Sequence, residues 1–214
     1  MIDWSWQRAE DALPVLWDGF KITLLATVIG FLVAMILGLV VAVIRRSGPR
    51  WLAIPVHAAT EFVRLTPIVV QLLFVYALLP QFTPLTIGIA VLGVHYASYM
   101  AEVYRAGIEE VPVGQWEAAR ALSLPGTRTW RAVILPQVAR NSLPALGNNA
   151  VSMFKDTPYL FTISVVELVT AAQTYGAAHF AYLEAFTLAG AFFLVASYPT
   201  SVLIRRLERL LAHR

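Results

Sequence analysis

Three charged side chains stand inside long apolar stretches of the sequence. Glu102 lies in the stretch 87–104, and Lys155 and Asp156 lie in the stretch 143–166. Ionisable residues within membrane segments are costly and usually mark a solute or ion pathway. Opposite charges beside polar backbone groups could receive a zwitterionic solute. The equally weighted alternative is that Lys155 and Asp156 pair with each other or with Glu102.

Three uncharged polar residues extend this candidate pathway. Thr157 follows Asp156 and precedes Pro158. A proline frees a backbone carbonyl, so we expect local unwinding of the helix around a cavity at this point. Thr66 and Gln71, on another apolar stretch, are weaker candidates for the same pathway.

No recognisable catalytic motif accompanies these residues. The sequence contains no G-x-x-x-x-G-K-[ST], no G-x-S-x-G and no H-E-x-x-H. It has no cysteine, which excludes disulfides and thiolate metal sites, and its four histidines lack ligand spacing. We therefore expect no catalytic residue, no metal site and no cofactor in this chain. The energy for uphill transport would have to come from another chain.

The composition indicates a membrane protein. Of the 214 residues, 58% are hydrophobic and 14% are charged, and the mean hydropathy is +0.68. Soluble domains usually carry about 25% charged residues. A membrane-spanning helix needs roughly 20 mainly apolar residues. The sequence therefore predicts an all-α polytopic membrane protein with five transmembrane helices in a single domain, residues 1–214; the candidate spans are 19–44, 56–80, 87–104, 143–166 and 180–204.

Arginines are concentrated on alternate connections between these spans. They follow the first span, recur in the loop 105–142 and end the chain in the tail 205–214. Cytoplasmic connections carry the excess of Arg and Lys, so the N-terminus is expected outside and the C-terminus in the cytoplasm. Glu167 and Glu184 should then lie near the outer surface, where solvation is the favoured interpretation and docking of a binding protein the alternative. No nucleic acid partner is expected, because the arginines stand at the ends of apolar runs.

The first 18 residues lack the basic and apolar regions of a signal peptide. Residues 1–18 are instead expected to form an amphipathic lead-in at the membrane interface, anchored by Trp4, Trp6 and Trp17.

Small residues recur every four positions in the first span. On a helix they form one stripe, and such stripes let two membrane helices approach closely. Packing within the chain is the favoured interpretation, and a seam between two subunits is the alternative. The stripe comprises Ala26, Gly30, Ala34, Gly38 and Ala42.

The segment 117–136, EAARALSLPGTRTWRAVILP, is unusually polar for this chain. Alanine and arginine favour a first helix, Pro125 and Gly126 a turn, and Thr127 the cap of a second helix. Pro136 should break that second helix. A rigid element of this kind could dock a partner, and an ordinary solvated loop is the alternative. The apolar face of the second helix would comprise Trp130, Val133 and Ile134.

This segment resembles the EAA loop of ABC-importer permeases, through Glu117, Ala118, Ala119, Leu135 and Pro136. Ser123 stands where the family usually has glycine, with Gly126 near enough to take over the turn. The stretch EFVRLTPIVVQLLFVYALLP is similar to the family's R-G-T-P-L-x-V-Q region. YMAEVYRAGIEEVPVGQWEAA and MFKDTPYLFTISVVEL resemble the polar amino-acid (histidine/glutamine permease) branch. The resemblance covers nearly the whole chain.

The resemblance implies the type I permease fold and a bacterial cytoplasmic (inner) membrane location. It implies two ATP-binding subunits, a second permease subunit (identical or sister) and an extracytoplasmic solute-binding protein as partners, besides membrane lipid. The residues that would contact the ATPase are Glu117, Ala118, Ala119, Ser123, Gly126, Leu135 and Pro136.

The solute is less defined by the resemblance. HYASYMAEVYRAGIEEVP and FAYLEAFTLAG are most similar to ectoine/hydroxyectoine permeases, and a generic polar amino acid is the alternative. Ectoine carries a delocalised cation, which the aromatic faces of Tyr99, Phe154 and Tyr159 could bind. A stand-alone ion-coupled secondary transporter of amino acids is the competing function. Inverted repeats, expected in many such carriers, are not evident in the sequence.

Overall fold

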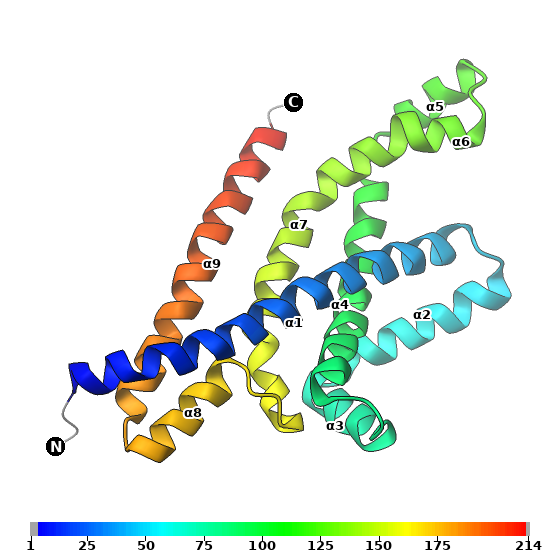
Figure 1. The fold of residues 1–214 in the computed structure, drawn as a ribbon. Coiled ribbons are helices and arrows are strands. Elements are labelled where there is room, and N and C mark those ends of the chain that lie inside the picture. Colours follow the sequence, from blue (N-terminus) through cyan, green and yellow to red (C-terminus); the bar gives the residue numbers. More distant parts are fainter. Residues whose placement is uncertain (1–3, 213–214) are drawn as a thin grey trace.

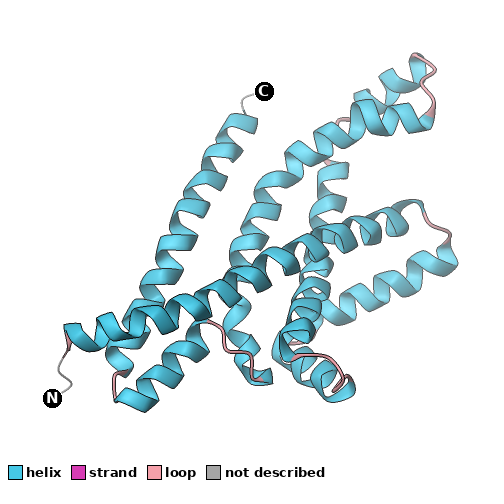
Figure 2. Ribbon diagram, viewed as in Figure 1, coloured by secondary structure: helices cyan, strands magenta, loops and turns pink. Residues whose placement is uncertain are grey.

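The computed structural model describes residues 4–212, and this range is helical with no strand (Figures 1 and 2). The predicted all-α class is therefore confirmed. Four long helices form the body of the protein: α1 (Trp6–Ser47), α4 (Pro84–Glu109), α7 (Leu135–Asp156) and α9 (Tyr182–Ala212). The shorter elements are α2 (Arg50–Leu65), α3 (Ile68–Leu78), α5 (Val113–Ala121), α6 (Gly126–Arg128), the π-helical η1 (Thr129–Ile134), the 3₁₀-helical η2 (Thr157–Ile163) and α8 (Leu168–His179).

The two ends of the molecule carry different elements. In Figure 1, α5, α6 and the C-terminal end of α9 project toward one end, whereas α3, α8 and the start of α1 lie toward the other. Helix α1 crosses the body and packs against α4, α7, α8 and α9. The predicted coupling segment and the C-terminal end of α9 thus lie on the same side of the helical body.

Three helices among the described residues are long and apolar enough to cross a membrane: α1, α4 and α9. Helices α2 and α3 form a fourth candidate if the pair, bent by 109°, is counted as one broken span. The expected span 143–166 corresponds to α7 and η2. Polar residues interrupt α7, so it falls outside this set, yet it packs against α1, α4 and α9.

The beginning of α1 is tied to the α8–α9 turn by a buried carboxylate. Glu184 accepts hydrogen bonds from the Ser5 N–H at 2.9 Å and pairs with Arg8 at 3.0 Å. Glu167 is also buried and accepts hydrogen bonds from N–H groups in the first turn of α8. Burial raises the pKa of the Glu167 carboxyl, although these donors favour its ionised form. The expectation that both glutamates are solvated is wrong, because each is used inside the chain as a cap or anchor.

The small-residue stripe of α1 is the contact surface for its neighbours. All five stripe residues are buried within this single chain. A Cβ atom built on Gly38 would stand 2.7 Å from the Met100 Cβ of α4, and one on Gly30 would stand 3.3 Å from the Met153 Sδ of α7. Packing within the chain, the favoured interpretation of the stripe, is therefore confirmed.

A left-handed residue closes α5. Ser123 has φ = 51°, and its N–H donates to the Arg120 carbonyl at 2.9 Å. The Leu124 N–H donates to the Ala119 carbonyl at 3.0 Å. These two bonds form a Schellman motif with Ser123 at the C′ position, where glycine is preferred because it has no Cβ. Ser123 therefore supplies the left-handed residue of this turn itself, and Gly126, which begins α6 and has no positive φ, does not take over the turn.

Two sequence predictions for the following helix are wrong. Pro125, rather than Thr127, occupies the N-cap position of α6. Pro136 does not break the chain direction, because it lies in the first turn of α7, where a missing N–H is tolerated. The helix widens to the π form just before it, with the Leu135 N–H bonded to the Trp130 carbonyl five residues back.

Replacing Gly38 by alanine should loosen the α1–α4 contact. The new Cβ would overlap Met100, and overpacking of this kind costs about 1–3 kcal/mol. We expect a lower midpoint of thermal unfolding in detergent for Gly38→Ala. The matched control is Gly190→Ala, whose Cβ would meet no heavy atom within 4 Å. Equal midpoints for the two variants would contradict this account of the stripe.

Replacing Ser123 by glycine should stabilise the α5–α6 turn. The left-handed conformation costs a non-glycine residue about 1–2 kcal/mol, which glycine avoids. We expect slower limited proteolysis within 117–136 for Ser123→Gly and faster proteolysis for Ser123→Val. Gly126→Ala serves as the control and should have little effect, since Gly126 has ordinary helical geometry and open space around it. Faster cleavage of Ser123→Gly would show that the turn is not strained.

Candidate functional site

The helix pair α2–α3 breaks between Thr66 and Pro67. Pro67 has no N–H, so the carbonyl of Val63, four residues earlier, lacks its helical donor. The side chain of Gln71 replaces that donor: its Nε2 lies 2.7 Å from the Val63 carbonyl oxygen and 2.7 Å from Thr66 Oγ1. An irregular backbone inside an apolar layer requires such compensation. Thr66 and Gln71, both predicted pathway residues, are thus brought together by the break.

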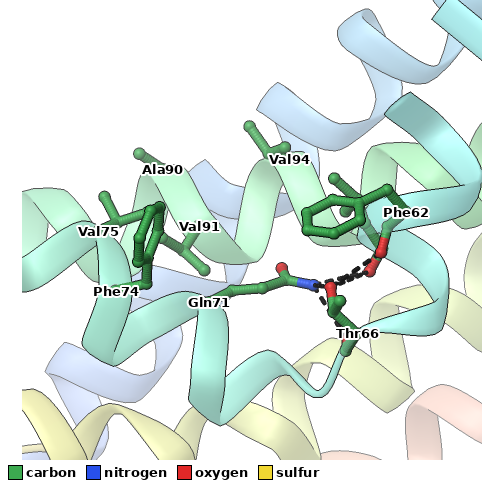
Figure 3. Close-up of a pocket in the computed structure, with 9 residues that line it drawn as sticks. Phe62, Thr66, Gln71, Phe74, Val75, Ala90, Val91 and Val94 are labelled. Atoms are coloured by element: carbon green, nitrogen blue, oxygen red, sulfur yellow. Dashed lines mark hydrogen bonds between the residues drawn. The ribbon is translucent and has the colours of Figure 1, made fainter. Parts of the chain in front are cut away.

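A cavity of about 250 Å³ lies beside this break (Figure 3). Gln71 and Thr66 form its polar edge, and the rings of Phe62 and Phe74 stand at opposite sides of it. The remaining walls are apolar. These walls suit an uncharged group. A charged solute would therefore need a side chain of opposite charge outside the cavity.

Gln71 connects the break to α4 through His95. The Gln71 Oε1 lies 3.2 Å from His95 Nδ1, a contact that requires the proton on Nδ1 because an amide oxygen only accepts. The His95 ring contacts the rings of Tyr96 and Tyr99, at centroid distances of 5.6 and 5.3 Å. The Tyr96 hydroxyl donates to Asp156 Oδ2 at 2.6 Å. A continuous polar and aromatic path therefore joins the break in α2–α3 to the end of α7.

Sequence reasoning missed His95 and Tyr96 as parts of this path. The histidines were considered only as metal ligands, for which their spacing is unsuitable. The available signal was the spacing of His95, Tyr96 and Tyr99 on one helix, which gathers three polar rings in one place. His95 and Tyr96 are both buried, so their polar atoms need partners within the protein.

Asp156 is the carboxylate that this path presents. Its side chain is half-buried, and Oδ1 accepts no hydrogen bond within residues 4–212. The ring of Tyr96 lies 5.9 Å from that of Tyr99, which is more exposed. A carboxylate oxygen beside phenol rings can bind an ammonium group by a charge-assisted hydrogen bond and a cation–π contact.

A second helix break follows Asp156. Helix α7 ends there, as expected from Pro158, but η2 continues in the tighter 3₁₀ form, so the helix tightens at this point and the predicted unwinding is wrong. Pro158 removes the donor for the Phe154 carbonyl, and Thr157 Oγ1 donates to that oxygen at 2.8 Å instead. Thr157 is fully buried. Its hydroxyl is therefore committed to the backbone, and any role in the pathway is to shape the break.

Glu102 lies apart from Asp156, near the end of α4 that leads to α5. Its carboxylate accepts hydrogen bonds from Arg45 of α1 at 2.5 Å and from Arg105 at 2.7 Å, and Arg64 of α2 approaches to 4.0 Å. The alternative in which Glu102 pairs with Lys155 or Asp156 is wrong, because its carboxylate is paired with these arginines instead. Glu102 ties the ends of three helices together.

Lys155 is exposed, and within the described part of the chain it forms no ion pair with Asp156. Consecutive residues on a helix point in directions about 100° apart, so the two charges face different surroundings. The three intramembrane charges predicted as one cluster are therefore separate. No three His, Asp or Glu residues of the described chain gather where they could hold a metal ion.

The predicted coupling residues form a mostly exposed surface. Only Ala119 is buried; the exposed residues are Glu117, Ala118, Ser123, Gly126, Leu135 and Pro136. Behind this surface, the predicted apolar face of the second helix is confirmed. Ile134 is buried in a cluster with Ile108 and Val111 from the end of α4, and Trp130 and Val133 pack against it.

Comparison with known proteins places this architecture in one family. Residues 30–213 match the family described as the inner membrane component of binding-protein-dependent transport systems. A probable amino-acid ABC transporter permease of Sinorhizobium fredii is 42% identical over 201 residues, which cover 92% of this chain and 87% of that protein. The glutamine transport system permease GlnP of Escherichia coli is 34% identical over 215 residues, covering 97% and 98%.

Solved structures agree with this relationship. The structure of an amino acid ABC transporter with histidines has a TM-score of 0.90 and 30% identity, covering 97% of this chain and 99% of that chain. The methionine transporter MetNI in an inward-facing conformation has a TM-score of 0.73 at 19% identity, which supports the fold alone. Members of this family are transport components rather than enzymes. From the matched family, the relatives and the fold together, this chain belongs to the inner membrane components of binding-protein-dependent transport systems.

Proposed function

We propose that this chain is the permease of an ATP-driven importer for a small zwitterionic solute. The observation that carries the proposal is the half-buried Asp156, held by Tyr96 at a helix break. Its second oxygen is available to the ammonium group of a solute. Relatives named for glutamine, cystine and glutamate/aspartate transport support a polar amino acid. The ectoine-like sequence stretches support ectoine or hydroxyectoine as the alternative zwitterion.

The segment 117–136 would supply the contact with a separate ATP-binding subunit, of which the whole assembly would hold two. The exposed carboxylate of Glu117 forms no hydrogen bond or ion pair within residues 4–212 and can therefore meet a partner. The second permease subunit and the extracytoplasmic binding protein complete the assembly. The arginine distribution supports an inner-membrane orientation with the N-terminus outside. The shared side of α5, α6 and the C-terminal end of α9 agrees with a cytoplasmic coupling segment (Figure 1).

Removing the charge of Asp156 should impair transport without disrupting assembly. A hydrogen bond to a charged group contributes about 1.5–3 kcal/mol, so we expect Asp156→Asn to lower kcat/KM of uptake roughly 10- to 100-fold. The measurement is uptake into proteoliposomes of the solute that the cognate binding protein selects in a thermal-shift screen of polar amino acids and ectoines. Asp18→Asn, at an exposed surface pair, is the matched control. Unchanged kinetics of Asp156→Asn would remove this residue from the substrate path.

Reversing the charge of Glu117 should uncouple the permease from its ATPase. We expect Glu117→Arg to insert normally in the membrane but to lose both co-purification of the ATPase and uptake, because the exposed segment would now repel its docking partner. Glu208→Arg makes the same change on the exposed surface near the C-terminal end of α9 and should retain both activities. Normal uptake by well-expressed Glu117→Arg would refute the coupling role.

A further inference from the structure

A cation–aromatic contact joins the end of α1 to the coupling segment. The guanidinium carbon of Arg46 lies 5.5 Å from the centroid of the Trp116 ring and 5.8 Å from that of the Trp130 ring. The two rings meet edge to face, with centroids 5.4 Å apart and planes at 79°. We call these three residues the Arg46 joint. They come from the last turn of α1, from α5 and from η1.

The tryptophans of the joint are themselves held in place. Both pack against the buried cluster that contains Ile108 and Val111 from the end of α4 and Ile134 from η1. Trp116 lies directly before Glu117, and Trp130 lies within the predicted docking segment. Arg46 therefore contacts the inner side of the same element whose outer side is exposed.

The neighbouring arginine has a different partner. Arg45 is committed to Glu102 by an ion pair, whereas Arg46 is positioned over the tryptophans. Two consecutive arginines thus fasten the end of α1 to two elements, α4 and the coupling segment. An arginine suits the second contact because its planar guanidinium can stack on aromatic faces, which a lysine ammonium cannot do in the same way.

We propose that Arg46 is a positioning residue that makes the coupling segment and the adjacent end of α1 move as one rigid body. This inference rests on the proposed function, in which an ATPase displaces the coupling segment. The displacement reaches α4 directly, because residues 110–112 join α4 to α5, and it reaches α1 through the joint. The covalent chain alone would not transmit the displacement to α1, because α1 and α5 are far apart in the sequence.

The test measures the distance across the joint. Val43 of α1 and Val113 of α5 are both exposed, and the chain has no cysteine, so Val43→Cys and Val113→Cys accept spin labels at these two positions only. The distance between the two spin labels is measured by double electron–electron resonance. It is recorded for the permease alone and for its complex with the ATPase before and after trapping with ATP and vanadate. We expect one narrow distance distribution that trapping leaves unchanged.

Arg46→Gln should release the joint. Loss of cation–π contacts to two rings should raise roughly tenfold the proportion of molecules in which the coupling segment is separated from α1. This would appear as a broadened distance distribution in the permease alone and in the complex. Arg46→Lys, which keeps the cation, should restore the narrow distribution in part. Arg50→Gln, a nearby exposed arginine, should match the unsubstituted protein. A narrow distribution in Arg46→Gln, or a distance that changes on trapping in the unsubstituted protein, would overturn the proposal.

Failure of the proposed function and failure of the positioning role of Arg46 give different results. Co-purification of the ATPase with the unsubstituted permease reports on the proposed function. If the ATPase does not bind, that function fails, while the distribution in the permease alone still decides whether Arg46 holds the joint. If the ATPase binds Arg46→Gln as well as the unsubstituted permease but the distance broadens, the effect is one of positioning and not of docking.

Discussion

Backbone carbonyls that lose their donor to a proline constrain the interior of this permease. Water cannot compensate such a group in an apolar layer, so the chain must do so itself. At Pro67 the donor is the amide of Gln71, and at Pro158 it is the hydroxyl of Thr157. At each helix break, a polar side chain of the protein therefore satisfies the backbone carbonyl that the proline leaves without a donor. The same side chains that sequence reasoning assigns to a solute pathway first serve the backbone.

This constraint decides where a free polar group can remain. The amide nitrogen of Gln71 donates hydrogen bonds at the helix break, and its oxygen contacts His95. From His95 the path continues to Tyr96, whose hydroxyl donates to Asp156. Glu102 is neutralised by arginines near the end of α4. Asp156 is consequently the carboxylate that we propose for the solute, since its Oδ1 accepts no hydrogen bond within residues 4–212.

Patterns local in sequence predicted the fold well. The stripe of small residues, the end of the α-helix before Pro158 and the apolar face of Trp130, Val133 and Ile134 all follow from helix periodicity or proline chemistry. Contacts between distant segments were not accessible in this way. Nothing in the sequence around Glu102 shows that Arg45, in another helix, reaches it before Asp156 does. The burial of Glu184 against the start of α1 likewise depends on the packing of two distant helices.

The turn at Ser123 depends both on local hydrogen bonds and on packing between distant segments. A serine in a left-handed conformation is unfavourable by itself, so the surrounding structure must over-determine that conformation. The Schellman hydrogen bonds fix the turn from within α5, and the packing of Trp116 and Trp130 under Arg46 fixes α5 and η1 relative to each other. A glycine at position 123 would relax the turn but would leave the joint intact. The predicted coupling segment is therefore held both by the hydrogen bonds of the turn and by the aromatic contacts beneath it.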